Sequence, residues 1–178
     1  MDVHIEAWAD SDLDLLLQAN TPAMTEHLGG PETEAKVLAR HRRYLEVDGT
    51  GWMFRIAVDG APAGSIGYWD RFWNGMQVFE TGWAVLPAFQ GKGIATLAAR
   101  LVIDAARAHG RHRFLHAFPS IHHPASNGIC RAAGFTLRGE CAVEYPTGSL
   151  RRCNDWCLEL PGPPTASGGV SELTTGRA

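Results

Sequence analysis

The feature that most constrains this chain is a short glycine-bearing segment, Gln90–Ala95 (QGKGIA), placed between an apolar run and a long helical pattern. The apolar run, Gly82–Pro87, is typical of a strand, and Thr96–His109 continues with helical character. The first amides of a helix have no partner within it and carry the positive end of the helix dipole. Glycines let a phosphate approach the backbone, and Lys92 adds a positive charge. The segment therefore predicts a site for a phosphate or pyrophosphate.

Two common phosphate-binding loops fit this segment poorly. The dinucleotide fingerprint G-x-G-x-x-G requires a third glycine where this chain has Thr96. The P-loop requires a Lys-Ser or Lys-Thr pair after its second glycine, and the segment has none. A glycine turn that binds no ligand stays open as an alternative, because short motifs also match by chance.

The segment resembles the Q/R-x-x-G-x-G/A signature of the GNAT superfamily, the acyl-CoA N-acyltransferases, through Gln90, Gly93 and Ala95. The longer run Glu80–Thr96 (ETGWAVLPAFQGKGIAT) resembles the corresponding run of one subgroup, the ribosomal-protein N-terminal acetyltransferases.

Two later segments extend the resemblance. His123–Ser126 (HPAS) stands where the subgroup has N-x-A-S, and Ala133–Phe135 (AGF) matches its closing L-G-F. The resemblance covers roughly residues 3–160 and is strong over residues 79–135. It implies a mixed α/β fold of the α+β type, in which helices flank a mostly antiparallel central sheet.

The same resemblance implies acetyl-CoA as the cosubstrate, with its pyrophosphate on the glycine segment. The pantetheine arm would pair, like an extra strand, with the end of the strand before that segment. Pro87 has no backbone N–H and would help to end strand pairing there. A splayed sheet edge with free amides suits an amide-bearing arm. The expected cofactor contacts are Trp83, Ala84, Val85, Gln90, Gly91, Lys92, Gly93, Ile94, Ala95, Thr96, His123 and Ser126.

Amide formation from a thioester needs a base for the amine, stabilisation of the oxyanion and a proton for the leaving thiolate. No covalent nucleophile is required, so the resemblance implies direct attack in a ternary complex. Glu80 matches the subgroup's acidic residue and is the first candidate for the general base, directly or through a water. A carboxylate that only anchors the neighbouring loop is the alternative. Glu144 is the second candidate, with a solvated strand end as its alternative.

Ser126 matches the subgroup's serine beside the CoA sulfur, where its hydroxyl would protonate the thiolate or hold the pantetheine. A helix cap is the structural alternative. The expected helix over residues 124–133 lacks the tyrosine that many GNAT enzymes use. His123 replaces the family's asparagine and is expected to hydrogen-bond the cofactor arm or to move a proton. His122 and His123 have no third ligand at matching spacing, so we expect no metal site.

Aromatic residues gather between the second helix and the glycine segment. Phe72 and Trp73, beside Asn74, are expected to line an acceptor pocket in which Asp70 or Glu80 attracts a cationic amine.

Hydrophobic periodicity predicts the other elements. Strands are expected over about residues 3–8, 52–58, 63–70, 76–85, 113–118, 135–144 and 152–160. Helices are expected over about residues 10–20, 31–47, 91–109 and 124–133, with Pro31 in a first helical position. The third helix presents an apolar face of Ile94, Leu97, Leu101, Val102 and Ala105. Residues 1–160 are then one domain, and residues 161–178, rich in Pro, Gly, Ser and Thr, are expected to be a disordered tail.

Composition excludes several classes of function. The formal net charge of −3 gives no basic excess for nucleic acid or an anionic membrane. No apolar run approaches the ~20 residues of a membrane helix, and no signal segment opens the chain, so we expect a cytoplasmic protein. The cysteines are expected to be free thiols: Cys130, Cys141, Cys153 and Cys157.

Together these features predict an N-acetyltransferase that moves an acetyl group from acetyl-CoA to a primary amine of a small molecule, with a homodimer as one possible assembly. A protein N-terminal amine is the alternative acceptor. A non-catalytic acyl-CoA-binding module is a hypothesis from another class, against which Glu80 and Ser126 argue. An ATP-binding protein is a third hypothesis, and the absent Lys-Ser/Thr pair argues against it.

Overall fold

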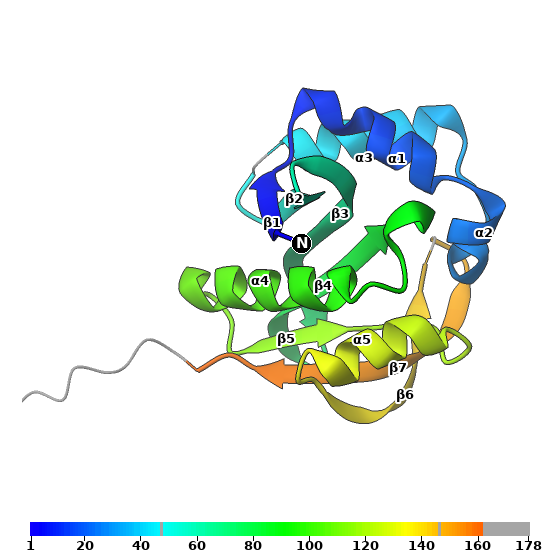
Figure 1. Cartoon of the computed structure of the whole chain (residues 1–178). Helices are drawn as coiled ribbons and strands as arrows, with labels where there is room; N and C mark the ends of the chain where they lie inside the picture. The colour runs from blue at the N-terminus through cyan, green and yellow to red at the C-terminus, as the bar shows by residue number, and fades with distance from the viewer. Residues whose placement is uncertain (47, 146, 162–178) are drawn as a thin grey trace, which may run out of the picture.

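The computed structural model describes residues 1–46, 48–145 and 147–161. Its strands form one sheet in the order β1-β2-β3-β4-β5-β7-β6 (Figure 1). Strands β4 and β5 pair in parallel, and each of the other neighbouring pairs is antiparallel. The expected mixed, mostly antiparallel sheet is therefore confirmed. The strands are β1 Val3–Ala7, β2 Gly51–Val58, β3 Ala61–Trp73, β4 Met76–Val85, β5 Phe114–Ala117, β6 Thr136–Glu144 and β7 Leu150–Glu159.

Helices cover the two faces of the sheet with separate apolar cores. The larger core packs α4 against sheet residues such as Phe79 and Leu115. The smaller core joins Leu16 of α1 and Val37 of α3 to Leu86 at the end of β4. The helices are α1 Leu13–Ala19, α2 Pro22–Thr25, α3 Glu34–Leu45, α4 Ile94–His109 and α5 Pro124–Ala132, with 3₁₀ turns η1 Asp10–Asp12, η2 Glu26–Leu28 and η3 Pro87–Phe89.

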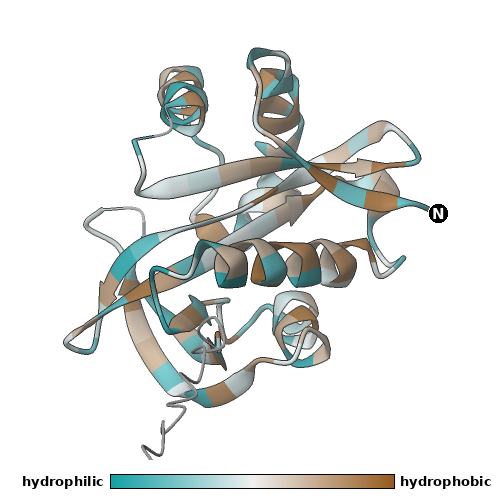
Figure 2. Ribbon diagram, turned by 90° about the vertical axis from the view of Figure 1, so that its left-hand side faces the viewer, coloured by the Kyte–Doolittle hydropathy of each residue, from teal (hydrophilic) through white to brown (hydrophobic). Residues whose placement is uncertain are grey.

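The predicted apolar face of α4 is confirmed at Ile94 and Val102, which are buried, and is wrong at Leu97. Leu97 is 37% exposed. Figure 2 shows brown and teal residues alternating along α4, as expected of a helix with one buried side. The buried residues of α4 are Ile94, Ala98, Ala99, Val102, Ile103 and Ala106.

The β3–β4 hairpin is longer than the sequence predicts. Strand β3 continues to Trp73, and its last residues pair in register with β4, ending at Trp73↔Met76. The chain turns at Asn74 and Gly75, whose φ angles are 49° and 81°. An Asn-Gly pair at positive φ is a preferred two-residue hairpin turn, and this signal accounts for the extra strand length.

The second predicted helix starts later than expected. Helix α3 begins at Glu34, so Pro31 is not in its first turn. The side chain of Asn20 holds the backbone of Glu32 at both its N–H (2.8 Å) and its C=O (2.9 Å), which keeps this segment out of the helix. The short helix α2 was also not predicted, although the Thr21 side chain caps it.

Other expectations agree with the described structure. Strand β4 covers the predicted residues 76–85, and Gly110 ends α4 with φ of 69°. The four cysteines are free, and Cys141 is the least buried of them. Helices of the described residues are too short or too polar to cross a membrane. The tail predicted to be disordered lies almost entirely outside the described residues.

Candidate active site

Strands β4 and β5 pair over a very short stretch. Their parallel register covers Phe79↔Leu115 and Glu80↔His116. Strand β4 then continues to Val85 in register with β3, while β5 ends at Ala117. The two strands therefore part beyond Glu80, and the far edge of β4 is left without a partner strand in the described part of the chain. This is the splayed edge that the sequence predicts beside Trp83, Ala84 and Val85.

The segment after β4 leads into α4 through two left-handed glycines. Gly91 and Gly93 have φ of 73° and 78°, and a Cβ added at either would meet no atom within 4 Å. Gly93 is the N-cap of α4, and among the described residues no side chain bonds the first amides of this helix. The first intrahelical donor is Leu97 N–H, which bonds Gly93 C=O at 3.1 Å. The amides of Ile94, Ala95 and Thr96 are therefore available to an anion.

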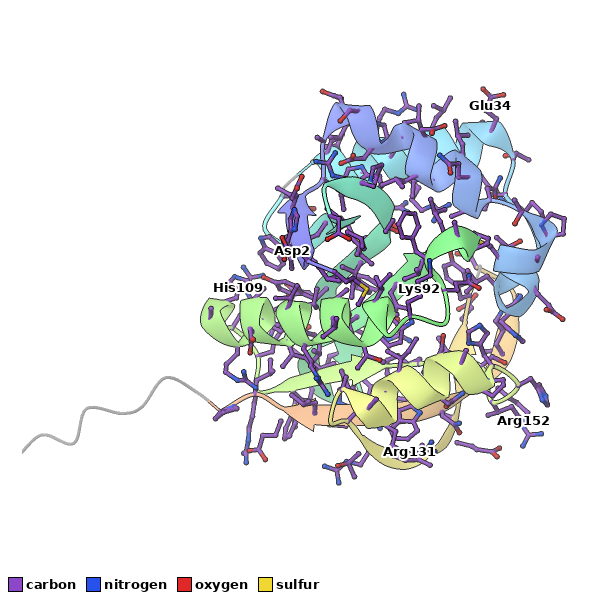
Figure 3. All side chains as sticks on the ribbon, viewed as in Figure 1. Asp2, Glu34, Lys92, His109, Arg131 and Arg152 are labelled. Atoms are coloured by element: carbon purple, nitrogen blue, oxygen red, sulfur yellow. The ribbon has the colours of Figure 1, made fainter. Side chains whose placement is uncertain are left out.

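Side chains of the loop support its backbone. Gln90 Nε2 donates to Val85 C=O at 2.8 Å and ties the loop to the end of β4. Lys92 Nζ donates to Ala88 C=O at 2.8 Å and lies 5.9 Å from the centre of the Phe89 ring. Figure 3 labels Lys92 at the start of α4. The ammonium is thus held by the turn that precedes the glycines.

The start of α5 is capped by its own sequence. His123 is the N-cap, and its Nδ1 accepts a hydrogen bond from Ser126 N–H at 3.0 Å. The capping role that we had considered for Ser126 thus belongs to His123, and the Ser126 hydroxyl is not used as the cap. Burial and the neighbouring His27 lower the pKa of His123, which favours the neutral ring that this bond requires. With Nδ1 accepting, Nε2 carries the ring proton and is a donor.

A buried amide ties α5 to β7. Asn127 Nδ2 donates to the C=O groups of Ser120 and His123, each at 2.9 Å. Asn127 Oδ1 accepts from Asn154 Nδ2 at 2.7 Å and from Trp156 Nε1 at 2.8 Å. The partners of this network lie far apart in the chain, so local sequence patterns do not indicate it. It fixes the position of α5, and with it Ser126.

Glu80 lies on the sheet face opposite α4. Phe79 belongs to the core under α4, and side chains alternate along a strand, so Glu80 points the other way. Its carboxylate accepts from Arg71 Nη1 at 2.6 Å, and its side chain is 14% exposed. Burial raises the pKa of Glu80, and the Arg71 cation opposes that rise. A buried carboxylate with a raised pKa, at the point where the strands part, has the properties of a general base.

A second ion pair lies one strand away. His116 Nδ1 and Asp155 Oδ1 are 2.6 Å apart, and Asp155 Oδ2 accepts from Trp73 Nε1 at 3.0 Å. Burial disfavours the His116 cation, but hydrogen bonds with Asp155 and Cys157 outweigh it and raise the pKa to about 9. The same His116 contact helps to lower the pKa of Asp155 against its own burial. No local pattern in the sequence indicates this pair, because its members are 39 residues apart.

Two sequence candidates have other contacts. Asp70 lies on the same face as Phe79 and is paired with Arg111 (2.7 Å) and His112 (2.9 Å). It therefore does not attract an amine beside Glu80, because it is on the other side of the sheet and already neutralised. Glu144 is exposed, and its Oε1 accepts from Gly148 N–H at 2.6 Å, which is the contact of a turn cap.

The elements that carry the candidate residues meet at one end of the molecule. Figure 1 shows the loop before α4, the start of α5 and α2 in the right-hand half of the molecule. A surface hollow of about 460 Å³ lies elsewhere, among Arg107–Arg113 and Glu159–Pro161 near the end of α4. Its arginines are paired with Asp104, Asp70 and Glu159, and it is separate from the glycine loop.

Residues 2–136 match the family model of the acetyltransferase (GNAT) domain. The chain belongs to this family. It is an acetyl-CoA-dependent N-acetyltransferase, and the resemblance seen in the sequence is confirmed. A search of curated proteins found no match.

Solved structures of GNAT acetyltransferases share the fold at low sequence identity. The ribosomal L7/L12 α-N-protein acetyltransferase RimL, in complex with CoA, aligns with a TM-score of 0.72 and 20% identity over 89% of this chain and 94% of that one. The aminoglycoside acetyltransferase AAC(6′)-Ib with paromomycin and acetyl-CoA gives 0.74 and 17% over 89% and 94%. Spermidine N-acetyltransferase from Vibrio cholerae with CoA and spermine gives 0.73 and 14% over 89% and 95%.

These GNAT structures act on different classes of amine, so the fold alone does not assign the acceptor. Among the described residues of this chain, no three His, Cys, Asp or Glu side chains lie close enough together to hold a metal ion.

Proposed function

We propose that this GNAT protein transfers the acetyl group of acetyl-CoA to a primary amine of a small molecule, by direct attack in a ternary complex. One observation carries the choice of a small acceptor. Arg151, at the start of β7, donates from Nη1 to the C=O of His27 in η2 at 2.8 Å. This contact joins the start of β7 to η2, which lies among the N-terminal helices. In the proposed arrangement this contact would narrow the approach to the acceptor site, which favours a small amine over the surface of a folded protein.

A second contact supports the same closure. The rings of His27 and His123 lie with their centres 4.2 Å apart, edge to face. His27 comes from η2 and His123 from the start of α5, so this pair joins the acceptor side to the cofactor side. The acceptor amine would enter between these joined elements and Glu80.

The geometry of the loop supports the cofactor roles that we propose. The amides of Ile94, Ala95 and Thr96, with Gly91, Gly93 and Lys92, would hold the pyrophosphate. The free edge of β4 at Trp83–Val85 would pair with the pantetheine amides. This arm would deliver the thioester to the place where β4 and β5 part.

The chemical roles fall to two side chains. Glu80 would take the proton of the attacking ammonium, directly or through a water, because its raised pKa makes it a stronger base than an exposed carboxylate. The Ser126 hydroxyl would protonate the departing thiolate, since its backbone is fixed by His123 and its hydroxyl is not used as a cap. Glu144 is the weaker candidate for the base because its carboxylate is bound to Gly148.

An N-terminal amine of a protein is the second candidate acceptor. The similarity to the ribosomal-protein acetyltransferase RimL favours it. The two candidates differ in the size of the group attached to the amine, and a panel of acceptors separates them.

The experiment is a mass-spectrometric assay of acetylated product with acetyl-CoA and a panel of amines. The panel holds spermidine, kanamycin, single amino acids and a peptide with a free N-terminal serine. Turnover of a small amine that is lost in Glu80→Gln supports the proposal. Turnover of the peptide alone would contradict the small acceptor, and full activity of Glu80→Gln would contradict the role of Glu80.

A further inference from the structure

Arg71 and Glu80 meet across the β3–β4 hairpin as diagonal neighbours. Arg71 stands opposite Val78 and Glu80 stands opposite Trp69, so the two side chains lie on the same face of the sheet. Arg71 Nη1 donates to Glu80 Oε2 at 2.6 Å, and the two side chains are 26% and 14% exposed. Because solvent screens a partly buried ion pair only weakly, the guanidinium acts directly on the carboxylate.

The Arg71 guanidinium packs on two aromatic rings. Its carbon Cζ lies 5.4 Å from the centre of the Trp73 ring and 4.9 Å from the centre of the Phe118 ring. The two rings contact each other edge to face, with their centres 4.7 Å apart. Trp73 is the last residue of β3, and Phe118 directly follows β5. The cation is therefore held by rings from two different strands, and each ring face attracts it.

Both rings are in turn anchored through His116, the register partner of Glu80. Trp73 Nε1 donates to Asp155 Oδ2 at 3.0 Å, and Asp155 Oδ1 lies 2.6 Å from His116 Nδ1. The Phe118 ring stacks on the His116 ring with the centres 5.7 Å apart. Two separate lines of contact thus fix the rings, so they can hold a long side chain in one place.

Other charged and titratable groups lie near this ion pair on the neighbouring strands. They are His116 on β5, Cys153, Asp155 and Cys157 on β7, and Arg138 and Cys141 on β6. His116 and Asp155 are paired with each other. Burial raises the pKa of Cys141 and of Cys153, so these thiols stay uncharged near neutral pH. Among the charged side chains of the described residues, the one that hydrogen-bonds the Glu80 carboxylate is Arg71.

This contact meets two needs of a general base. The base must be ionised before the reaction, and it must point at the proton that it takes. Burial raises the pKa of Glu80, and the Arg71 cation opposes that rise. A carboxylate bonded to a fixed, planar guanidinium also has a defined orientation.

We propose that Arg71 is a positioning residue for acetyl transfer, whose guanidinium, held by Trp73 and Phe118, orients the Glu80 carboxylate and keeps it ionised for the attacking amine. This inference rests on the proposed role of Glu80 as the base. Arg71 acts through Glu80, and it contacts neither the thioester nor the amine.

The first test follows the ionisation of Glu80 and needs no turnover. The protein is labelled with glutamate that carries carbon-13 in its carboxyl group, and NMR follows the Glu80 signal, identified by its loss in Glu80→Gln, as the pH is changed. Arg71→Gln removes the charge but keeps a hydrogen-bond donor. We expect Glu80 in this variant to titrate about one pH unit or more above its position in the wild type. Arg71→Lys keeps the charge, so its Glu80 should titrate close to the wild type.

Arg111 provides a matched control on the opposite face of the sheet. It is also paired with a carboxylate, that of Asp70 at 2.7 Å, and its Cζ lies 5.3 Å from the centre of the Trp52 ring. Arg111→Gln therefore removes the same kind of ion pair and ring contact without touching Glu80. Neither the titration of Glu80 nor acetyl transfer should change in this variant.

The second test is the pH profile of acetyl transfer, measured with the amine of the panel that reacts fastest. In Arg71→Gln the fall of kcat/KM at low pH should move upward together with the titration of Glu80. In Arg71→Lys this fall should stay in place, while kcat is about tenfold lower at every pH. The reason is that a lysine ammonium supplies the charge but does not fix the orientation of the carboxylate.

The hold of the rings has a variant of its own. Phe118→Leu removes one ring and keeps an apolar side chain, and kcat should fall about two- to fivefold, as expected from the loss of one cation–π contact. Circular dichroism and thermal melting show whether each variant is folded. If Arg71→Gln does not fold, the kcat of Arg71→Lys still tests the proposal.

Three results would overturn the proposal in whole or in part. A Glu80 that titrates in Arg71→Gln as in the wild type would show that Arg71 does not control its charge. A wild-type kcat in Arg71→Lys would show that the guanidinium does not orient the base, and a wild-type kcat in Phe118→Leu would remove the role of the ring.

Failure of the proposed function gives a different result. Full activity of Glu80→Gln, together with a shifted titration of Glu80 in Arg71→Gln, would mean that Arg71 controls the carboxylate but that Glu80 is not the base.

Discussion

The two helices that begin beside the parting strands start in opposite ways. Helix α4 begins at Gly93, a left-handed residue without a side chain, and its first amides have no protein partner among the described residues. Helix α5 begins at His123, whose ring accepts from Ser126 N–H. The first start exposes the backbone, and the second satisfies it with a side chain.

This difference suggests separate roles for the two helix starts. A bare helix start with glycines can hold a phosphate through backbone amides, which need no particular side chain. A capped helix start does not offer its bonded amide to a phosphate. Its capping residue instead fixes the orientation of the helix and of the hydroxyl at Ser126. We call the end of β4 with the start of α4 the β4 side of the site, and β5 with the start of α5 the β5 side. We infer that the β4 side holds the cofactor, and that the β5 side positions the groups that move protons.

The largest effect should come from Glu80, which lies on β4 where this strand pairs last with β5. Glu80→Gln keeps the size of the side chain and its bond to Arg71 but removes the base. We expect kcat for acetyl transfer to fall about 10²- to 10⁴-fold, with CoA affinity unchanged. Steady-state kinetics together with calorimetric titration of CoA measures both. A loss of less than about tenfold in kcat would assign the base elsewhere.

The His116–Asp155 pair on the β5 side should make the free energy of unfolding depend on pH. The folded state raises the pKa of His116 from the ordinary 6.5 to about 9. Its contribution to stability is therefore complete below pH ~6.5 and is lost as the pH rises through ~9, up to about 3 kcal/mol. Urea unfolding between pH 6 and 10 should show this fall in the wild type. In His116→Gln the free energy of unfolding should fall less over this pH range, by up to the same amount. The same pH dependence in the variant and the wild type would contradict the ion pair with Asp155.

The β4 side should bind CoA more weakly when a side chain blocks access to its backbone amides. Gly93→Val places a β-branched residue at a φ of 78° and a side chain over the amides. We expect the dissociation constant for CoA to rise roughly tenfold or more, from backbone strain of about 1–3 kcal/mol together with blocked approach. Gly110→Val is the matched control, because Gly110 ends the same helix with a φ of 69°. Equal CoA affinity in the two variants would mean that the effect comes from strain alone.

The smallest effect should come from the cap of α5. His123→Ala removes the acceptor for Ser126 N–H and should cost about 1 kcal/mol of unfolding free energy. His123→Asn restores a capping side chain and should recover most of it. Chemical denaturation of the three proteins gives the values. A His123→Ala variant as stable as the wild type would show that the cap contributes nothing.

Local sequence patterns predicted the elements of the β4 side. They did not predict the side-chain contacts of the β5 side. The strand, the glycines and α4 are neighbours in sequence, so composition and the family signature indicated them. The network of Asn127 and the pair of His116 and Asp155 join residues 29 and 39 positions apart. Such contacts depend on how β7 lies beside β5, which one sequence does not reveal.

Smaller differences have local causes. An Asn-Gly turn extended β3 to Trp73, and Asn20 delayed the start of α3 by binding the backbone of Glu32. The predicted attraction of an amine by Asp70 was wrong because side chains alternate along β3, which puts Asp70 on the face opposite Glu80. The contacts predicted for the cofactor stay predictions.

The most direct test of this account is amide hydrogen exchange, followed by NMR, in the protein with and without CoA. We expect CoA to slow exchange at Ile94, Ala95 and Thr96, whose amides have no hydrogen-bond partner in the described residues of the protein alone. The amide of Ser126, already bonded to His123, should change much less. Slowed exchange at α5 with no change at Ile94–Thr96 would contradict the assignment of the cofactor to the start of α4.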